Sequence, residues 1–97
     1  ETRTTHTEWG AKYSLDLSEV MFSPGNRGER KRMGRMADRR ECVLDMFAGI
    51  GYFSIPMSIS GAEVTAVEKN AVAMRYLREN IRLNHIGGNL HPIRKII

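Results

Sequence analysis

Two glycines, Gly49 and Gly51, stand one residue apart in residues 45–53, which read DMFAGIGYF and follow the apolar residues CVL. Glycine inside a regular element destabilises it by about 0.5–1 kcal/mol relative to alanine. The pair therefore predicts a tight turn or a close approach of the backbone to a ligand. A glycine-rich turn between a buried strand and a helix lets backbone N–H groups reach a ligand at the carboxyl end of a parallel sheet.

Two carboxylates accompany this turn. Glu68 ends the next predicted strand, nineteen residues after Gly49, where an acidic residue accepts hydrogen bonds from ribose hydroxyls. Asp45 ends the first strand. A dinucleotide would prefer glycine or alanine in place of Ser54, and its pyrophosphate would be repelled by Asp45. S-adenosylmethionine carries a sulfonium and an ammonium group, which Asp45 favours, so the pattern favours that cofactor. Glycines that serve only a tight turn remain the other interpretation.

The elements that must position these residues follow from periodicity and from turn residues. A strand is predicted over 11–17 with a hairpin partner over 20–22, and a helix over 27–37. The next strand covers 42–47 and the helix after it covers 52–60, with Pro56 in its first turn. A strand over 63–68, an amphipathic helix over 71–84 capped by Asn70, and a strand over 90–97 complete the pattern.

Alternating strands and helices of these lengths predict an α/β fold with a right-handed parallel unit. Pro92 cannot donate to a ladder, so the last strand should lie at an edge, in the strand order 3-2-1. The apolar run over 42–47 predicts a strand buried on both faces, with Cys42 as a buried apolar residue. The sequence thus predicts the N-terminal half of a Rossmann-like domain, preceded by a β-hairpin and a basic helix.

The composition of the 97 residues is that of one small globular domain, with 41% hydrophobic and 27% charged residues. No apolar run reaches the roughly 20 residues that span a bilayer. No secretory signal is recognisable. A single cysteine fits a reducing, cytoplasmic setting. No zinc pattern is present, because His6, His85 and His91 are scattered, so no metal is expected.

The net charge of +4 is concentrated in one segment. Its cations are Arg27, Arg30, Lys31, Arg32, Arg35, Arg39 and Arg40, and they are opposed only by Glu29 and Asp38. Such a cluster attracts polyanions, among which nucleic acid is the most common. A solvated helix face explains the same charge pattern, and the charges alone favour that interpretation.

Four separated blocks resemble the Met-10+-like family of tRNA-modifying enzymes. They read HTEWG (6–10), VMFSPGNRGERKRM (20–33), DMFAGIGYFSIP (45–56), and VEKN (67–70) followed by LRENIRLN (77–84). The resemblance covers nearly the whole chain and implies a transferase that uses S-adenosylmethionine to modify position 37 of tRNA. One branch of the family methylates N1 of guanine. The wybutosine-synthesising protein 2 branch transfers the 3-amino-3-carboxypropyl group to 4-demethylwyosine.

Two stretches resemble the wybutosine branch rather than the methyl branch. They are Gly51-Tyr52-Phe53, where the methyl branch reads Gly-Pro-Phe, and residues 22–26, where it reads Phe-Ser-Pro-Arg-Leu. The resemblance therefore implies aminocarboxypropyl transfer. Guanine-37 N1-methylation is the first alternative, and a nucleoside-binding module without catalysis is the second.

The resemblance also implies roles for individual residues. The expected cofactor contacts are Ser23, Arg30, Asp45, Phe47, Gly49, Gly51 and Glu68, and the expected RNA contacts are Arg27, Lys31 and Arg35. Residues 1–40 would end an RNA-proximal domain, and residues 41–97 would begin the cofactor-binding domain. The family's catalytic loop would follow the fourth strand, so no catalytic residue is predicted within this chain. The sequence does not predict the oligomeric state.

Overall fold

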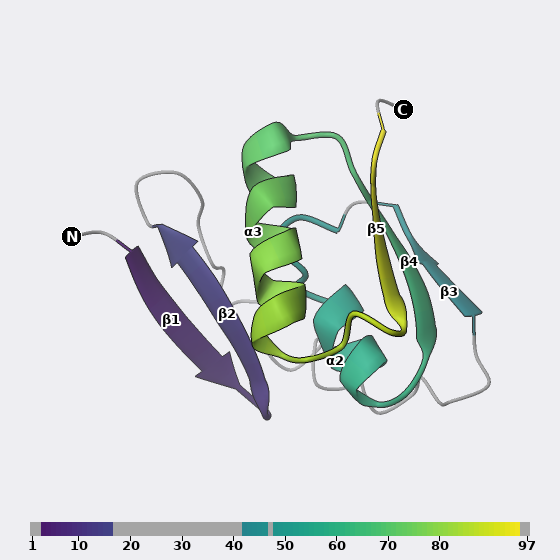
Figure 1. Ribbon diagram of the computed structural model, residues 1–97, viewed down its shortest axis with the longest axis horizontal. Coiled ribbons are helices and arrows are strands. Elements are labelled where there is room, and N and C mark those ends of the chain that lie inside the picture. The colour runs from purple at the N-terminus through teal and green to yellow at the C-terminus, as the bar shows by residue number, and fades with distance from the viewer. Residues whose placement is uncertain (1–2, 17–41, 47, 96–97) are drawn as a thin grey trace.

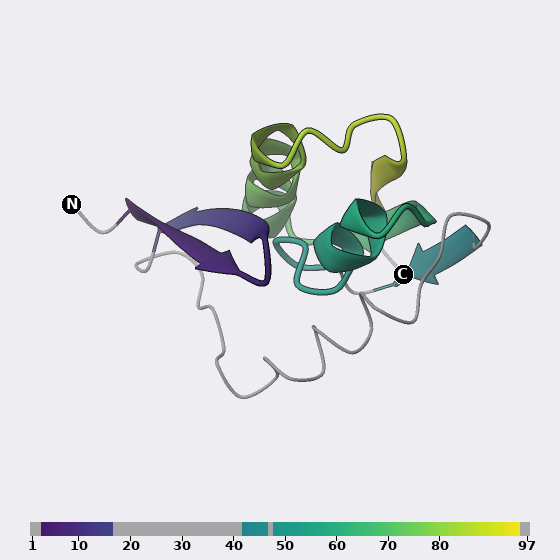
Figure 2. The same cartoon turned by 90° about the horizontal axis from the view of Figure 1, so that it is seen from below.

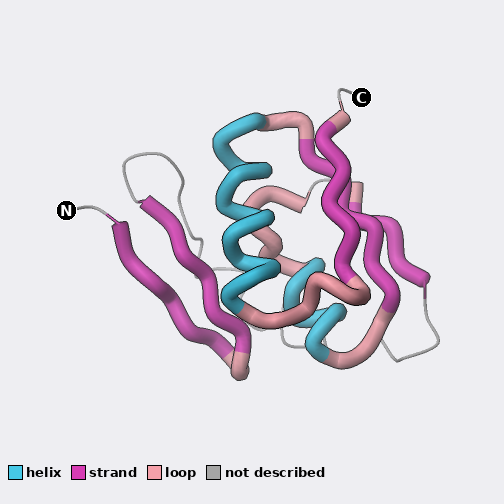
Figure 3. Tube along the Cα trace, viewed as in Figure 1, coloured by secondary structure: helices cyan, strands magenta, loops and turns pink. Residues whose placement is uncertain are grey.

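The computed structural model describes residues 3–16, 42–46 and 48–95. In chain order, its described elements are β1 (Arg3–Glu8), β2 (Ala11–Asp16), β3 (Cys42–Asp45), α2 (Ser54–Ile59), β4 (Glu63–Glu68), α3 (Ala71–Leu83) and β5 (Leu90–Arg94). Figure 1 labels them, and Figure 3 separates helices from strands by colour. The predicted strand over 20–22, the basic helix and the domain boundary at residue 40 lie outside the described residues.

β1 and β2 form an antiparallel hairpin in which Glu8 pairs with Ala11. Trp9 and Gly10 make the two-residue turn, with φ of 53° and 84°. Positive φ at both residues is the geometry that matches the twist of the flanking strands. The sequence predicted β2 but gave it residues 20–22 as a partner. Among the described residues the partner of β2 is β1, which the sequence did not predict; residues 20–22 lie outside the described residues.

β3, β4 and β5 form a parallel sheet in the order β3-β4-β5. The predicted strand order is therefore confirmed, with β4 in the centre. Pro92 in β5 lies opposite Ala66 of β4. Among the described strands β5 pairs only with β4, so the position that Pro92 predicted for it at an edge is confirmed.

Both helices lie on one side of this sheet, between it and the hairpin (Figures 1 and 2). The core of the chain is formed by side chains from all three layers. Tyr13 of β2, Val64 of β4 and Leu77 of α3 are each fully buried. Since Tyr13 and Leu15 of the hairpin belong to the same core cluster as the helices, the hairpin is packed onto the α/β unit by apolar contact.

The other face of the sheet is largely open in the described structure. Leu44 of β3 is 60% exposed, Ile93 of β5 is 44% exposed, and Cys42 is exposed. The prediction that the 42–47 strand is buried on both faces, with Cys42 inside, is therefore wrong. Both described helices cover the same face of the sheet. Because successive side chains of a strand point to opposite faces, Cys42 and Leu44 of β3 point to the face that no described helix covers.

Candidate functional site

The turn between β3 and α2 is held against the carboxyl end of β4. The Ala48 N–H donates to the carbonyl of Val67 (3.1 Å), and the Gly51 N–H donates to the carbonyl of Ala48 (2.9 Å). Gly49 has φ of +58° and Gly51 has φ of +108°. These contacts confirm that the chain reverses at the two glycines, at the edge of the sheet where the sequence predicted the site.

The two glycines are also required by the packing of the turn. A Cβ atom on Gly49 would lie 2.8 Å from Cε2 of Tyr52, and one on Gly51 would lie 2.5 Å from Cδ1 of Ile55. Real Cβ atoms do not approach other atoms so closely. The interpretation of the glycines as a tight turn is thus correct in itself, and it is compatible with a ligand site at the same place.

Glu68 faces the glycine turn, as the sequence predicted. Its Oε1 accepts a hydrogen bond from the Gly49 N–H (2.8 Å), and its Oε2 accepts one from the Asn70 N–H (2.8 Å). An ionised carboxylate has about four lone-pair sites, so two accepted bonds leave capacity for a ligand's hydroxyl groups. The two backbone donors fix the orientation of this partly buried carboxylate between the turn and the start of α3.

Asp45 is oriented by a residue that the sequence had not assigned to the site. The Ser54 hydroxyl donates to Oδ2 of Asp45 (2.6 Å), and Ser54 is fully buried in the first turn of α2. A glycine or alanine at this position could not make this bond. Ser54, the residue that disfavoured a dinucleotide, therefore positions the carboxylate of Asp45. The signal in the sequence that could have indicated this role was a serine nine residues after Asp45, at the start of the predicted helix.

Asn80 joins the glycine turn to the rest of the molecule. Its Nδ2 donates to the carbonyls of Ile50 (3.1 Å) and Ser14 (3.2 Å), and its Oδ1 accepts from the Ser14 N–H (2.5 Å). The side chain is fully buried. Sequence reasoning missed this residue, because an asparagine inside a helix gives no sign of which distant backbone groups it meets.

The remaining predicted contacts fall outside the described residues. These are Ser23, Arg30 and Phe47 for the cofactor and Arg27, Lys31 and Arg35 for RNA. Among the residues that the structure does describe, no cluster of histidine, cysteine and acidic side chains has the makings of a metal site. No helix in the same part of the chain is long and apolar enough to cross a membrane.

The family model described as TRM5/TYW2 methyltransferase domain matches residues 4–95. A relative from Methanocaldococcus jannaschii, named tRNA(Phe) (4-demethylwyosine(37)-C(7)) aminocarboxypropyltransferase, is 48% identical over 95 residues, covering 96% of this chain and 38% of the relative. A Pyrococcus abyssi relative, named tRNA (guanine(37)-N(1))-methyltransferase Trm5b, is 45% identical over 92 residues, covering 95% of this chain and 28% of the relative.

A solved structure gives the same result for the fold. The chain superposes on TYW2 of M. jannaschii in complex with AdoMet with a TM-score of 0.92 and 49% sequence identity, covering 97% of this chain and 43% of that one. The predicted α/β fold and the predicted family resemblance are both confirmed. The chain spans less than half the length of each of these relatives.

Proposed function

Because the chain belongs to the family of TRM5/TYW2 methyltransferase domains, we propose that it forms the first part of the cofactor-binding domain of a tRNA-modifying enzyme. In this proposal the whole protein transfers the 3-amino-3-carboxypropyl group of S-adenosylmethionine to 4-demethylwyosine at position 37 of tRNA. The relative at 48% identity carries the name of that activity.

The observation that carries the proposal is the orientation of Glu68. Its carboxylate is held by the Gly49 N–H at 2.8 Å, at the carboxyl end of the central strand. That is the place where folds of this type accept the ribose hydroxyls of an adenosine. A carboxylate turned away from the glycine turn would have removed the basis for a nucleoside-containing cofactor.

The residues around the turn fit S-adenosylmethionine by their charge. When bound, this cofactor supplies a sulfonium that activates the carbons attached to it. Asp45, held by Ser54, offers a negative charge to the cationic end of the ligand. Glu68 would orient the ribose. From the family resemblance we propose that Ser23 and Arg30 hold the amino-acid end, because an arginine can form a forked pair with a carboxylate.

Binding of tRNA is proposed for the basic segment that precedes the sheet. Arg27, Lys31 and Arg35 would contact phosphates, whose charge supplies much of the affinity in such complexes. The domain boundary near residue 40 would then separate an RNA-proximal part from the cofactor-binding part. No general base is assigned to this chain.

Methyl transfer to N1 of guanine 37 is the second candidate. The P. abyssi relative with the methyltransferase name is 45% identical, which is close to the 48% of the aminocarboxypropyltransferase. The sequence Gly51-Tyr52-Phe53 favours aminocarboxypropyl transfer. The methyl branch of the resembled family reads Gly-Pro-Phe at these positions. The two reactions differ in which carbon beside the sulfonium is presented to the base, at about 3–3.5 Å.

Two labels distinguish these reactions in the natural protein. With S-adenosylmethionine labelled in the carboxyl group of its methionine part, and tRNA bearing 4-demethylwyosine, we expect the label to enter the tRNA. With a label in the methyl group, we expect none to enter. The reverse result, on tRNA with guanine 37, would establish methyl transfer. If the protein binds the cofactor but transfers neither label to either tRNA, both transferase functions are excluded. The chain would then act as a nucleoside-binding module without catalysis.

A further inference from the structure

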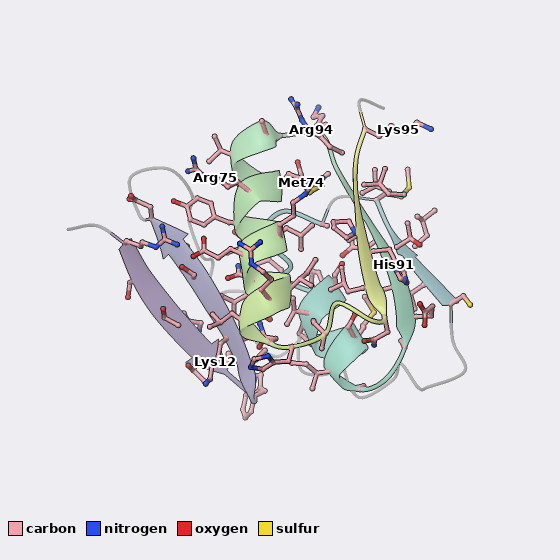
Figure 4. All side chains as sticks on the ribbon, in the orientation of Figure 1. Lys12, Met74, Arg75, His91, Arg94 and Lys95 are labelled. Carbon is pink, nitrogen blue, oxygen red and sulfur yellow. The ribbon has the colours of Figure 1, made fainter. Side chains whose placement is uncertain are left out.

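The outer face of α3 carries charges of a single sign. The exposed residues of this helix, all of which the structure describes, are Ala71, Arg75, Arg78 and Arg82. At 3.6 residues per turn they fall within about 60° of one another around the helix axis. Figure 4 places Arg75 on the side of α3 that faces away from the three-stranded sheet. We propose that Arg75, Arg78 and Arg82, the arginine stripe, dock the phosphate backbone of an RNA.

α3 carries three arginines against one acidic residue, Glu79. Solvated helix faces commonly alternate acidic and basic residues, which support each other at spacings of three and four. Glu79 borders the stripe, four residues after Arg75 and three before Arg82, and its carboxylate pairs with Arg3 of β1. Arg78 and Arg82 form no ion pair with any carboxylate in the described residues. Arg78 and Arg82 stand four residues apart, and like charges at that spacing repel, so an anion bound beside them would stabilise the helix.

The type of cation favours phosphate as the partner. α3 contains three arginines and no lysine. The planar guanidinium pairs with phosphate through two parallel hydrogen bonds, whereas lysine acts as a point charge. From Arg75 to Arg82 the stripe runs about 10 Å along the helix. A straight row of cations suits a linear polyanion with regularly spaced phosphates. A folded protein would need a matching row of carboxylates.

A groove extends the stripe towards the hairpin. It has a volume of about 580 Å³ and lies between β1, β2 and the second half of α3. Glu79, Arg82 and His85 line it on the helix side, and Arg3, which pairs with Glu79, lines it on the hairpin side. The arginine stripe therefore reaches, through Arg82, a depression between the helix and the hairpin.

The stripe is also placed suitably for the site. α3 begins three residues after Glu68, and Arg75 lies in the second turn of the helix. An RNA that lies along the stripe therefore has one end beside the glycine turn. This inference rests on the proposed function, since it takes the RNA to be the tRNA substrate, and it adds a second phosphate-binding surface to the basic segment around Arg30.

The test measures tRNA binding by the natural protein at several salt concentrations. The first variant carries Arg75→Gln, Arg78→Gln and Arg82→Gln together, since glutamine is a good helix former. We expect its affinity for tRNA to fall by at least about tenfold and the slope of log affinity against log salt to fall by about 2. Its affinity for S-adenosylmethionine should not change. The matched variant with three lysines should retain the slope, and Ala71→Gln on the same face should alter neither quantity.

The outcomes separate this inference from the proposed function. Unchanged tRNA affinity and slope in the glutamine variant would overturn the stripe, while the transfer of carboxyl label would still uphold the function. A natural protein that neither binds tRNA nor transfers label would overturn both. Polyglutamate serves as the competing probe: if the stripe binds it as tightly as tRNA, the surface fits an acidic protein and the inference is wrong. A glutamine variant with a lowered urea-unfolding midpoint but unchanged tRNA affinity also overturns it.

Discussion

Glu68 holds two backbone N–H groups, one on each oxygen, and these two bonds belong to different parts of the site. Gly49 lies in the turn after β3, and Asn70 caps α3. The carboxylate thus joins the turn to the helix N-terminus before any ligand binds. A ligand hydroxyl that reaches Glu68 meets an acceptor whose direction is already fixed, so little side-chain entropy is lost on binding.

Replacement of this carboxylate should weaken the cofactor complex. In Glu68→Gln one acceptor oxygen becomes a donor and the charge is lost. Hydrogen bonds to charged groups contribute about 1.5–3 kcal/mol, so we expect S-adenosylmethionine to bind about 10- to 100-fold more weakly. Titration calorimetry measures the change. Glu63→Gln is the matched control, because Glu63 starts the same strand and its exposed carboxylate pairs with His91. Equal affinities for Glu68→Gln and the parent would contradict the assigned role.

At the scale of the elements, the conformation of the glycine turn requires a residue without a side chain at position 51. A side chain there would have to adopt φ of +108° and would meet Cδ1 of Ile55 at 2.5 Å. Backbone strain and overpacking cost about 1–3 kcal/mol each, so Gly51→Ala should lower the free energy of unfolding by about 2–4 kcal/mol. Urea denaturation measures this loss.

A second glycine provides the comparison for this substitution. Gly88 lies in the exposed turn after α3, and a Cβ atom added to it would meet nothing within 4 Å. Gly88→Ala should therefore change the free energy of unfolding by less than about 1 kcal/mol, in either direction. If both substitutions had the same small effect, the turn at residues 48–51 would not be constrained as the packing indicates.

The elements differ in how far the sequence could predict them. α3 and β4 were found with accurate boundaries, because one has a strong apolar stripe with an asparagine cap and the other a bounded β-branched run. β1 was missed, because its first residues are exposed and polar and because Trp9, at φ of 53°, is not a usual residue for a turn of that kind. A continuous apolar run was read as burial on both faces, but β3 has a described helix layer on one face only.

The site shows the same division. Spacing alone located Gly49 and Glu68, since a strand, a turn and a second strand bring them together in any fold of this type. The bond from Ser54 to Asp45 and the bonds of Asn80 arise from packing between elements that are distant in sequence. No local pattern encodes which backbone carbonyl a buried amide will meet.

For the molecule as a whole, the contact of the hairpin with the α/β unit is polar as well as apolar. Asn80 in α3 and Asn84 at its C-cap stand one turn apart, and each bonds both backbone groups of a β2 residue. Asn80 pairs with Ser14, and Asn84 pairs with Lys12. These two asparagine side chains therefore satisfy backbone groups on the edge of β2 that does not pair with β1. Asn80 alone also reaches the Ile50 carbonyl in the glycine turn, so hairpin, helix and turn meet at one side chain.

Asn80→Leu should separate these three parts. Leucine fills a similar volume but leaves the Ser14 N–H and the carbonyls of Ser14 and Ile50 without partners in a buried place. Each unpaired buried group costs about 1–3 kcal/mol, and partial relaxation should leave a loss of about 2–4 kcal/mol in the free energy of unfolding. Asn84→Leu, which removes similar bonds nearer to solvent, should cost less than about 1.5 kcal/mol because water can replace them. Only Asn80→Leu should also weaken S-adenosylmethionine binding, since it alone frees the turn. Equal losses of stability and of affinity in the two variants would show that the hairpin contact acts as one unit and that Asn80 has no separate hold on the site.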